Sequence, residues 1–555
     1  MRIIIIGAVA AGTSAAAKAR RNNEDAQIVI YEKDTHISYS GCGMPYFLGG
    51  LVDSAEQLAP RDPAFFKTKY NVDIFIAHEV LALSPKDKSV EVKSLKTGEV
   101  FRDTYDKLVI ATGARATMPP IKGIDSPHVF ALRTMNDMLR IRQFMDGNRP
   151  QSALIVGAGF IGMELCENLH RVGIKVTLVE MLPQVTPGLD SDMAVRVQRH
   201  IEEKGVIVYT GVIADSITEH RILLSNGQDI RADMVIVATG VRPNTELAGA
   251  AGIELGVKSA IRVNSSMQTN DPDIYACGDC AECIQIVTGK PAYLPLGSTA
   301  NKQGRIAGDS MTGGDLTFRG VLGTGIFRIF DLTVGQTGLS ERDAKAQGYD
   351  VAIVHNIKPD KPEYMGGKEM VIKGIADKKS GRMLGVQIVG YEGVDKRRDV
   401  FVTAITYKAK AEDLFHLDLA YAPPFSTTKD PVMYTGMILS NAIKRGRELI
   451  TAEELDTLMH SGEKYTLIDV REPNQYDKQH VDTAQSIPHA RLREVLDTLD
   501  KNEMVVTYCN RGTSGNATQN ILINKGFAKV KSLSGGHKQY AATHSQDKDE
   551  TRRDE

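Results

Sequence analysis

One pattern occurs twice in this chain of 555 residues and limits its fold more than any other feature. Each copy has a short apolar strand, a turn of small residues, a helix and a second strand that ends in glutamate. The first copy runs from Ile3 to Glu32 and the second from Ala153 to Glu180. In such a βαβ unit the backbone of the turn approaches a pyrophosphate, and the acid accepts a hydrogen bond from a ribose hydroxyl. Two copies predict two bound dinucleotides and electron transfer between them.

The two turns differ in how fully they keep the glycines of this motif. The second turn has all three, whereas Val9 replaces the middle glycine of the first. An acid at position 180 accepts from a free 2′-hydroxyl and repels a 2′-phosphate, which favours NADH over NADPH. The residues predicted to contact the first dinucleotide are Gly7, Ala10, Ala11, Gly12 and Glu32, and those predicted for the second are Gly157, Gly159, Gly162 and Glu180.

Three later turns tie the two copies together. The predicted strands 107–110 and 234–237 are each followed by Ala-Thr-Gly, where the chain would cross between the two nucleotide domains. A third strand ends before Asp279, and we expect Asp279 to accept a hydrogen bond from a ribityl hydroxyl at the start of a helix. These turns add Thr112, Gly113 and Asp279 to the first nucleotide site and Gly240 to the second.

This ordered set of motifs resembles the flavoprotein disulfide reductases that bind two dinucleotides, over about residues 1–445. The resemblance implies an α/β fold with two nested Rossmann-like domains. FAD would bind to residues 1–112 and 240–320, and NADH to residues 113–239. Residues 321–445 would form an α+β dimerisation domain, which implies a homodimer.

Cys42 is the first candidate for a reacting group. It follows the first βαβ unit in Ser-Gly-Cys-Gly-Met-Pro-Tyr, and positions 37 to 47 hold no second cysteine. A reactive thiol without a partner forms a mixed disulfide with a substrate sulfur or is oxidised to a sulfenic acid. The alternative interpretation of Cys42 is a small buried packing residue.

The surroundings of Cys42 indicate which of these reactions is favoured. Related NADH peroxidases and water-forming oxidases carry a histidine in the first glycine loop, where this chain has Ala10. That difference favours a thiol substrate. The surroundings resemble the coenzyme A-disulfide reductases, including the Gly-Met-Pro-Tyr after the cysteine.

This second resemblance implies further site residues. Arg21, Ser38 and Ser40 would contact coenzyme A, with Arg21 at its phosphorylated ADP end. Tyr421 and Tyr364 of the dimer mate would reach the thiol, where a phenol can donate to or protonate a leaving thiolate. The alternatives are a solvated charge at the end of a helix for Arg21 and packed aromatic side chains at a dimer contact for the tyrosines.

Cys277, Cys280 and Cys283 follow one another at a spacing found in metal sites. A fourth ligand is missing nearby, and Cys277 lies inside the Tyr-Ala-Cys-Gly-Asp turn of the first nucleotide site. We therefore expect these cysteines to bind no metal.

The C-terminal part supplies a second candidate thiol, Cys509. Thr451 is predicted to cap a helix, and the strand 504–508 leads into a glycine-containing loop that begins with Cys509. The series of motifs resembles a single α/β rhodanese domain over residues 450–543, followed by a charged tail at 544–555. The resemblance implies that Cys509 carries sulfane sulfur in a loop of backbone N–H groups, with Arg511 adding positive charge. A phosphatase of similar fold would have arginine at position 515, which is glycine here; an inactive rhodanese-like domain is the alternative.

Composition narrows the setting of the protein. The net charge is −2, so nothing indicates a nucleic-acid or membrane-surface partner. The six cysteines lie far apart or inside glycine-rich loops, which fits a reducing cytoplasm rather than a disulfide framework. The apolar N-terminal segment is similar to a signal peptide in its arginine, apolar run and small residues. However, only one arginine precedes the apolar run, and the segment continues into the second strand. Both features favour a buried first strand.

The leading hypothesis is an NADH-dependent flavoprotein that reduces coenzyme A persulfide, polysulfide or disulfide through Cys42, with Cys509 as a sulfane-sulfur carrier. One alternative is an NADH oxidase or peroxidase in which Cys42 cycles through a sulfenic acid. Another is a sulfur or redox sensor without turnover. Which sulfur compound is the physiological acceptor, and how sulfur passes between the two thiols, stay open at this stage.

Overall fold

The computed structural model describes residues 1–544, which form two compact units. The first unit contains residues 1–183 and 206–323. The second contains residues 184–205 and the described residues from 324 onward. The predicted tail at 544–555 lies outside the described residues except for its first residue. The mixed α/β fold class predicted from the sequence is confirmed.

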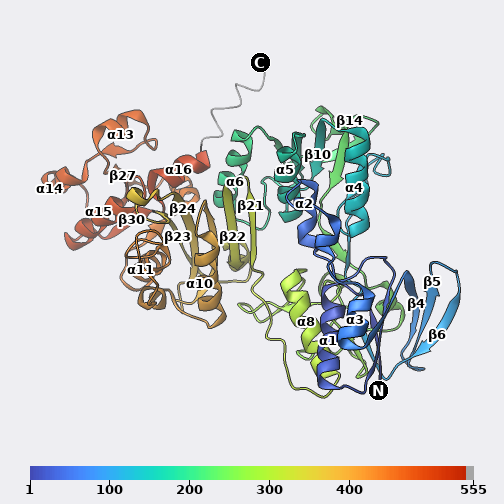
Figure 1. Cartoon of the computed structure of the whole chain (residues 1–555). Coiled ribbons are helices and arrows are strands. Elements are labelled where there is room, and N and C mark those ends of the chain that lie inside the picture. Colours follow the sequence, from blue (N-terminus) through green and yellow to red (C-terminus); the bar gives the residue numbers. More distant parts are fainter. Residues whose placement is uncertain (545–555) are drawn as a thin grey trace. The chain divides into compact units, whose positions relative to one another are not determined.

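The first unit contains two parallel five-stranded sheets (Figure 1). One has the strand order β18-β7-β1-β2-β3, so a strand from beyond residue 270 joins the N-terminal strands. Its elements are β1 (Arg2–Ile6), α1 (Ala10–Asn22), β2 (Gln27–Glu32), α2 (Met44–Leu48), α3 (Pro63–Tyr70), β3 (Val72–Ile76), β7 (Lys107–Ile110), β18 (Ile274–Ala276) and α8 (Gly297–Ser310).

The other parallel sheet has the order β12-β11-β10-β16-β9. It repeats the arrangement of the first, because the strand before the glycine loop again pairs with the strand that ends in glutamate. Its elements are β9 (Val129–Ala131), α4 (Met135–Asn148), β10 (Ser152–Val156), α5 (Phe160–Arg171), β11 (Lys175–Glu180), β12 (Ile207–Thr210) and β16 (Met234–Val237). Small antiparallel sheets add β4 (His78–Ser84), β5 (Ser89–Ser94) and β6 (Val100–Thr104), and β13 (Ala214–Ile217), β14 (Arg221–Leu224) and β15 (Asp229–Arg231).

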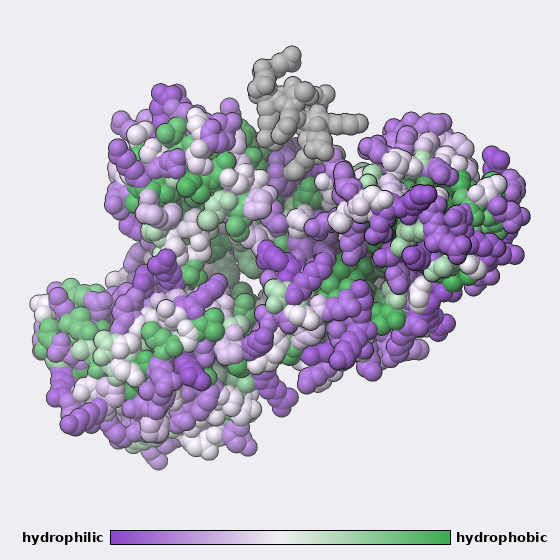
Figure 2. Space-filling model, turned by 180° about the vertical axis from the view of Figure 1, so that it is seen from behind, coloured by the Kyte–Doolittle hydropathy of each residue, from purple (hydrophilic) through white to green (hydrophobic). Residues whose placement is uncertain are grey.

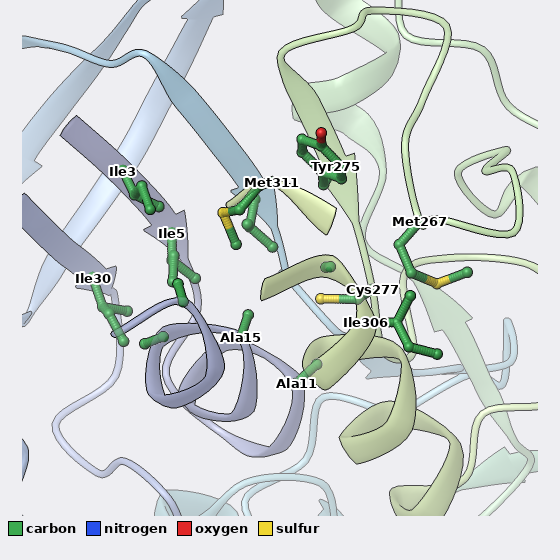
Figure 3. Packing of buried hydrophobic residues seen from close by; sticks show 14 of the residues in the cluster. Ile3, Ile5, Ala11, Ala15, Ile30, Met267, Tyr275, Cys277, Ile306 and Met311 are labelled. Atoms are coloured by element: carbon green, nitrogen blue, oxygen red, sulfur yellow. The ribbon is translucent and has the colours of Figure 1, made fainter. Parts of the chain in front are cut away.

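Close packing of α1 on α8 completes the first core (Figure 3). A Cβ at Gly304 or Gly308 of α8 would collide with the backbone oxygens of Ala11 and Ala15 of α1. Only glycine lets the two helix backbones approach this far. The core of this region combines isoleucines of β1 and β2 with small residues of α1 and apolar residues of α8 (Figure 3).

The second unit begins with an antiparallel sheet of order β21-β22-β25-β24-β23. Its elements are β21 (Gly325–Ile329), β22 (Leu332–Gly338), α9 (Glu341–Ala346), β23 (Val351–Pro359), β24 (Glu369–Asp377), β25 (Met383–Gly390), α10 (Val394–Thr406) and α11 (Pro431–Lys444). The helix α6 (Ser191–Glu203) also belongs to this unit, although it lies within the range predicted for NADH. The finer division of residues 1–445 into domains therefore stays a prediction.

The C-terminal sheet of the same unit is parallel, with the order β26-β30-β29-β27-β28. Its elements are β26 (Leu449–Ile450), α12 (Ala452–His460), β27 (Tyr465–Asp469), α13 (Pro473–Lys478), β28 (Gln485–Ser486), α14 (Leu492–Val495), β29 (Met504–Tyr508), α15 (Thr513–Asn524), β30 (Lys529–Leu533) and α16 (Gly536–His544). The predicted cap is present, because Thr451 accepts from the Glu454 N–H and Glu454 accepts from the Thr451 N–H. Such a cap contributes about 1 kcal/mol.

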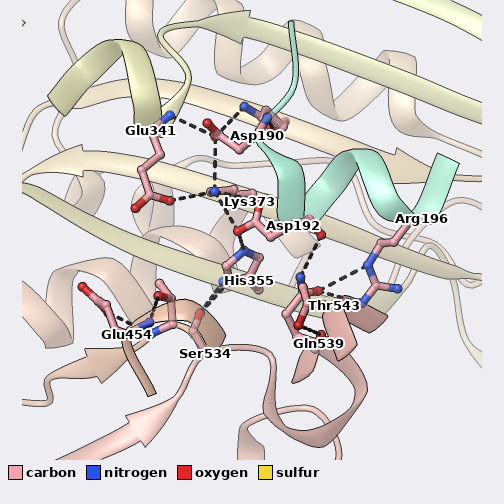
Figure 4. A network of polar contacts seen from close by, with 12 residues as sticks. Asp190, Asp192, Arg196, Glu341, His355, Lys373, Glu454, Ser534, Gln539 and Thr543 are labelled. Atoms are coloured by element: carbon pink, nitrogen blue, oxygen red, sulfur yellow. Dashed lines mark hydrogen bonds and ion pairs between the residues drawn. The ribbon is translucent and has the colours of Figure 1, made fainter. Parts of the chain in front are cut away.

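A buried polar network joins α6, the antiparallel sheet and the C-terminal sheet (Figure 4). Lys373 Nζ lies 2.7–3.2 Å from carboxylate oxygens of Asp190, Asp192 and Glu341. The imidazole of His355 contacts Asp192 Oδ2 at 2.7 Å through Nε2 and a serine hydroxyl beyond β30 through Nδ1. These contacts explain why α6 groups with the second unit.

The surface is largely hydrophilic on the face drawn in Figure 2, where smaller apolar groups interrupt it. Within residues 1–544, no helix has both the length and the apolar character needed to cross a membrane.

Candidate active site: two dinucleotide loops and two thiols

The two predicted dinucleotide loops have the same backbone geometry. Gly7 has φ +106° and Gly157 has φ +105°. A Cβ at Gly157 would lie 2.5 Å from the backbone oxygen of Ala238, and one at Gly7 would collide in the same way with Ala111. Both positions therefore require glycine for their φ and for the close approach of the neighbouring strand.

The third glycine of each motif closes the loop on the helix that follows. A Cβ at Gly12 or Gly162 would collide with the backbone oxygen of the first glycine of its own loop. The middle residues, Val9 and Gly159, are the N-caps of α1 and α5, and a Cβ at Gly159 would meet open space. Neither helix has a side-chain hydrogen bond at its N-cap, so the first N–H groups face the loop in both. This is the arrangement that binds a pyrophosphate.

The two glutamates take equivalent positions. Glu32 accepts hydrogen bonds from the N–H groups of Ala8 at 2.8 Å and Asp34 at 2.9 Å. Glu180 accepts from Ala158 at 2.8 Å and Leu182 at 2.9 Å. Burial raises the pKa of Glu32, which the two backbone N–H groups oppose. Each carboxylate is thus held at the end of its glycine loop, where it can also accept from a ribose hydroxyl.

The Ala-Thr-Gly turns lie beside these loops. Thr112 donates to the backbone oxygen of Asn244 at 2.6 Å, and the Asn244 N–H donates to the Gly113 oxygen at 3.0 Å. Gly240 has φ +98°, and its oxygen accepts from the Thr117 N–H at 2.9 Å. The two crossings are therefore joined by hydrogen bonds within the first unit.

The expectation that Asp279 stands at the start of a helix is wrong. Residues 278–281 form a turn, because Gly278 takes φ +82° and the Ala281 N–H donates back to it. The carboxylate of Asp279 accepts from Arg133 Nη2 at 2.6 Å, and its contact with a ribityl hydroxyl stays a prediction. With its glycine cradle and Glu32, the site fits FAD, and the second cradle with Glu180 fits NADH.

Cys42 is exposed in a short 3-10 helix, Gly41–Gly43, that leads directly into α2. Its segment is fixed on both sides. The Ser40 N–H donates to the Leu58 oxygen at 2.8 Å, and a Cβ at Gly49 would collide with Asn168 of α5. The interpretation of Cys42 as a buried packing residue is therefore wrong.

Three charged residues act on Cys42 electrostatically, and two of them, Arg133 and Glu164, were not predicted from the sequence. Partial removal from water raises the pKa of the Cys42 thiol, and Glu164 and Asp279 raise it further, whereas Arg133 lowers it. Burial raises the pKa of Glu164 to about 7, opposed by a hydrogen bond from the Tyr46 hydroxyl at 3.3 Å. Glu164 lies two residues after the last motif glycine, which was the only signal for it in the sequence.

The residues predicted to contact coenzyme A lie in the same unit as Cys42. Ser38 has φ +48° and its N–H donates to the Ala8 oxygen at 2.9 Å, while Ser40 is exposed. Arg21 is exposed at the end of α1, with its guanidinium 5.6 Å from the centroid of the Tyr70 ring.

Arg21 is part of a basic aromatic cluster that the sequence did not indicate. Lys69 Nζ lies 5.7 Å from the Tyr70 ring centroid and 5.3 Å from that of Phe65, and Arg61 stands 5.6 Å from Phe65. Such cation–π groups leave the cations available to a phosphate at the surface.

The two predicted tyrosines are exposed in the second unit. Tyr364 is 75% exposed in a short 3-10 helix, and Tyr421 is 48% exposed in the loop before α11. Phe425 nearby in sequence is 71% exposed. Their predicted role at the thiol of a dimer mate stays a prediction.

The three closely spaced cysteines have different surroundings. Cys277 belongs to the core under α1, whereas Cys280 belongs to the core on the other face of the same sheet. Cys280 donates to the backbone oxygens of Ile110 and Cys277 at 3.4 and 3.3 Å. Cys283 donates to Ala292 at 3.4 Å. Each side chain is accounted for by packing and local hydrogen bonds.

Cys509 is buried at the end of β29, in a loop shaped by glycines. Gly512 has φ +93° as the N-cap of α15, and a Cβ at Gly536 would collide with the Cys509 backbone. The His537 N–H donates to the Cys509 oxygen at 2.8 Å. Arg471, paired with buried Asp469, donates to the side chain of Asn510 beside the thiol at 3.3 Å. The loop is therefore held rigidly around its cysteine.

Comparisons with known proteins agree with this architecture. The family model of pyridine nucleotide-disulphide oxidoreductases matches residues 1–304, and the dimerisation-domain model of that family matches residues 326–431. The rhodanese-like domain model matches residues 451–543. The chain belongs to the pyridine nucleotide-disulphide oxidoreductase family and carries a C-terminal rhodanese-like domain.

Individual relatives are similar over most of their length. The chain is 39% identical to an NADH oxidase of Methanocaldococcus jannaschii, over 78% of this chain and 97% of the relative. It is 34% identical to a CoA-dependent NAD(P)H sulfur oxidoreductase of Pyrococcus furiosus, over 79% of this chain and 99% of the relative. The solved structure of an NAD-dependent persulfide reductase from A. fulgidus covers 98% of this chain and 100% of its own, with 37% identity and a TM-score of 0.89.

Proposed function

We propose that this protein is an NADH-dependent flavoprotein that reduces coenzyme A persulfide, polysulfide or disulfide at Cys42. The observation that carries the proposal is an exposed, unpaired thiol in a unit with two dinucleotide loops, on a chain that also has a rhodanese-loop thiol. The relatives named as a sulfur oxidoreductase and a persulfide reductase support it.

The reaction at Cys42 follows from thiol–disulfide exchange. The Cys42 thiolate attacks the inner sulfur of coenzyme A persulfide, hydrosulfide leaves, and a mixed disulfide joins Cys42 to coenzyme A. When bound, FAD supplies the relay by which the electron pair of NADH reaches this sulfur centre. Two electrons and a proton then cleave the mixed disulfide into the Cys42 thiolate and free coenzyme A.

The surrounding charges suit these proton and charge movements. Arg133 favours the thiolate of Cys42, while Glu164 opposes it. Because the pKa of Glu164 is about 7, this carboxyl can exchange a proton near neutral pH. Its neutralisation would favour the Cys42 thiolate.

The basic aromatic cluster supports coenzyme A as the thiol. Arg21, Arg61 and Lys69 stand on Phe65 and Tyr70, so they present cations and flat rings together at one surface. The phosphorylated ADP end of coenzyme A offers the complementary groups, namely phosphates and an adenine ring.

A homodimer in a reducing, cytoplasmic setting is part of the proposal. The dimerisation-domain match supports the dimer, and the exposed side chains of Tyr364, Tyr421 and Phe425 are of the kind that a partner subunit buries. All six cysteines are free, which suits a reducing compartment.

Cys509 would carry sulfane sulfur as a persulfide in its rigid loop. Fusion to the reductase raises the effective concentration of the shared sulfur intermediate at Cys42. The matched rhodanese-like domain and the retained cysteine support this part of the proposal.

An NADH oxidase or peroxidase is the second candidate, because one relative at 39% identity is named an NADH oxidase. That similarity covers 78% of this chain, and an oxidase or peroxidase reaction at Cys42 assigns no role to Cys509. Ala10 in place of histidine argues against the peroxide and oxygen reactions.

The test compares Cys42→Ser with Cys509→Ser in full-length, FAD-loaded protein. With NADH and coenzyme A persulfide, Cys42→Ser should lose sulfide release while keeping its flavin, and Cys509→Ser should retain it. Faster NADH turnover with peroxide or oxygen than with persulfide would contradict the proposal. Negligible turnover with every acceptor would point to a sensor instead.

A further inference from the structure

The rhodanese-like domain is packed closely on the antiparallel sheet beside Cys509. The His355 N–H of β23 donates to the hydroxyl of Ser534 at 2.7 Å. A Cβ at Gly535 would lie 2.9 Å from the Cβ of His355, so only glycine fits there. The end of β23 also lies near the loop of Cys509, because Arg511 of that loop stands 3.8 Å from Glu369, which pairs with Pro359 of β23.

Three cations belong to this region of the second unit. Lys358 stands near the end of β23, Lys429 comes just before α11, and Arg511 lies on the thiol loop itself. Lys358 Nζ lies 4.4 Å from the centroid of the Tyr434 ring, and Lys429 Nζ lies 5.9 Å from the same centroid. The ring holds both ammonium groups without neutralising them.

The pKa of Lys358 responds to the other two cations and to the thiol. Burial lowers the pKa of Lys358, Arg511 and Lys429 lower it further, and the negative charge of a Cys509 thiolate raises it. Among residues 1–544, Lys358 and Lys429 take part in no ion pair with a carboxylate. Arg511 stands 3.8 Å from Glu369, a carboxylate already paired with Lys538. The approach to Cys509 therefore carries an excess of positive charge.

The origin of the cations indicates the kind of anion that fits. A small inorganic anion that reacts with Cys509 needs only the backbone N–H groups and Arg511 of the same loop. Lys358 and Lys429 come from the other domain. They are therefore placed for a charged group that belongs to the same molecule as the reacting sulfur but lies several bonds away from it. Lysine ammonium groups bind phosphate oxygens as point charges.

We propose that Lys358, Lys429 and Arg511 bind the phosphate of a phosphorylated thiol, and that this site selects such thiols over uncharged ones for sulfur exchange with Cys509. The inference rests on the proposed role of Cys509 as a sulfane-sulfur carrier. It adds a selection step at the rhodanese-like domain, independent of any contact made near Cys42.

The exchange conserves atoms and electrons. The thiolate of the bound molecule attacks the outer sulfur of the Cys509 persulfide. The S–S bond to Cys509 breaks, Cys509 leaves as a thiolate, and the new S–S bond makes the persulfide of the phosphorylated thiol. The proton of the incoming thiol passes to solvent, and nothing is oxidised or reduced overall.

The experiment uses the full-length, FAD-loaded chain with Cys42→Ser, so that Cys509 is the reacting thiol. The protein is loaded with polysulfide, desalted, and mixed with pantetheine, 4′-phosphopantetheine or coenzyme A. Loss of the Cys509 persulfide is followed by cyanolysis at several thiol concentrations. Lys358→Gln and Lys429→Gln are compared with Lys361→Gln, a half-buried lysine three residues after Lys358 that is paired with Glu392 at 2.8 Å.

The phosphorylated thiols should react with a half-saturating concentration about tenfold below that of pantetheine, which corresponds to about 1.4 kcal/mol of binding. Lys358→Gln and Lys429→Gln should remove this preference without slowing pantetheine, whereas Lys358→Arg and Lys361→Gln should keep it. The preference should weaken as salt screens the charges. A preference for coenzyme A alone would assign the site to the phosphates of the ADP end, and an equal preference for both would assign it to the 4′-phosphate.

Two results would overturn the inference. One is a loss of rate in Lys358→Gln and Lys429→Gln that is equal for pantetheine and for the phosphorylated thiols, which would show a structural effect. The other is an unchanged preference in both variants. If Cys509 accepts no sulfur from polysulfide at all, the carrier role fails and the selection step fails with it. That outcome is distinct, because it appears before any acceptor thiol is added.

Discussion

Replacing Lys373 by methionine should destabilise the second unit strongly, because it leaves three largely buried carboxylates without their common cation. The amine contacts Asp190, Asp192 and Glu341 at 2.7–3.2 Å, and its side chain is 1% exposed (Figure 4). Methionine keeps most of the volume of the lysine stem, so a cavity contributes little. Removing one partner of a buried ion pair typically costs about 3–5 kcal/mol.

The matched control is Lys378→Met, which breaks an ion pair with Asp350 whose side chains are 53% and 74% exposed. Exposed pairs contribute less than about 1 kcal/mol. For a unit of this size, 3–5 kcal/mol lowers the unfolding midpoint by roughly 6–20 °C, against a few degrees or less for the control. Thermal unfolding of the full-length, FAD-loaded protein, followed by circular dichroism, measures both.

The pH dependence of the unfolding midpoints tests this reasoning most strictly. Burial raises the pKa values of Asp192 and Glu341, but nearby cations hold them below their ordinary range: His355 and Lys373 act on Asp192, and Lys373 and Lys345 act on Glu341. In the parent protein that stabilisation is present above the unfolded pKa values, about 4, and is lost as the pH falls through the lower folded values. In Lys373→Met the carboxylates repel one another and take up protons more readily, so its deficit should shrink between pH 7.5 and pH 5.5. Equal midpoint shifts for both variants, or a deficit that stays constant with pH, would refute this reasoning.

Three further changes test the sites. Glu164→Gln removes a charge that raises the pKa of Cys42, so the rate of Cys42 alkylation by iodoacetamide should rise at lower pH than in the parent. Replacement of an exposed carboxylate, Glu24→Gln, should leave this pH profile unchanged. A shift of the Glu164→Gln profile to higher pH would contradict the prediction. Gly159→Ala places a Cβ in open space where NADH would approach. It should raise the KM for NADH about tenfold, or about 1.4 kcal/mol, and leave the unfolding midpoint unchanged. In Gly162→Ala the new Cβ collides with the Gly157 oxygen, so this variant should have a lower unfolding midpoint. Tyr421→Phe should lower persulfide turnover by about 10²-fold if the phenol of Tyr421 serves the thiol site of a dimer mate. The control Tyr407→Phe, at a tyrosine that is 78% exposed, should leave turnover unchanged. Equal effects of the two substitutions would contradict this role of Tyr421.

Local patterns predicted the repeated parts of the fold well. The shared spacing predicted that Gly7 and Gly157 begin equivalent loops between a buried strand and a helix, and the two glycines have nearly the same φ, +106° and +105°. The cap at Thr451 was predictable for the same reason, because its partner Glu454 lies three residues away. In each case the physical cause is contained within a short stretch of chain.

Residues that meet only through tertiary packing could not be predicted in this way. Arg133 and Glu164 act on Cys42 from the region after β9 and from α5, far away in sequence. The expectation for Asp279 was wrong because a glycine turn, rather than a helix, follows β18. The end of β23, with Lys358, lies near the thiol loop only because a second domain is packed against the first, which no spacing in the sequence indicates.

The central claim is that Cys42 reacts directly with a sulfur of a coenzyme A compound. Peptide mass mapping of the oxidised, FAD-loaded protein after brief exposure to coenzyme A persulfide or disulfide tests it most directly. We predict a disulfide-linked coenzyme A on the peptide that contains Cys42, removed when NADH is added and absent from the peptides of the buried Cys166 and Cys277. A Cys42 peptide that carries only oxygen adducts, or that stays unmodified while NADH is consumed, would contradict the account.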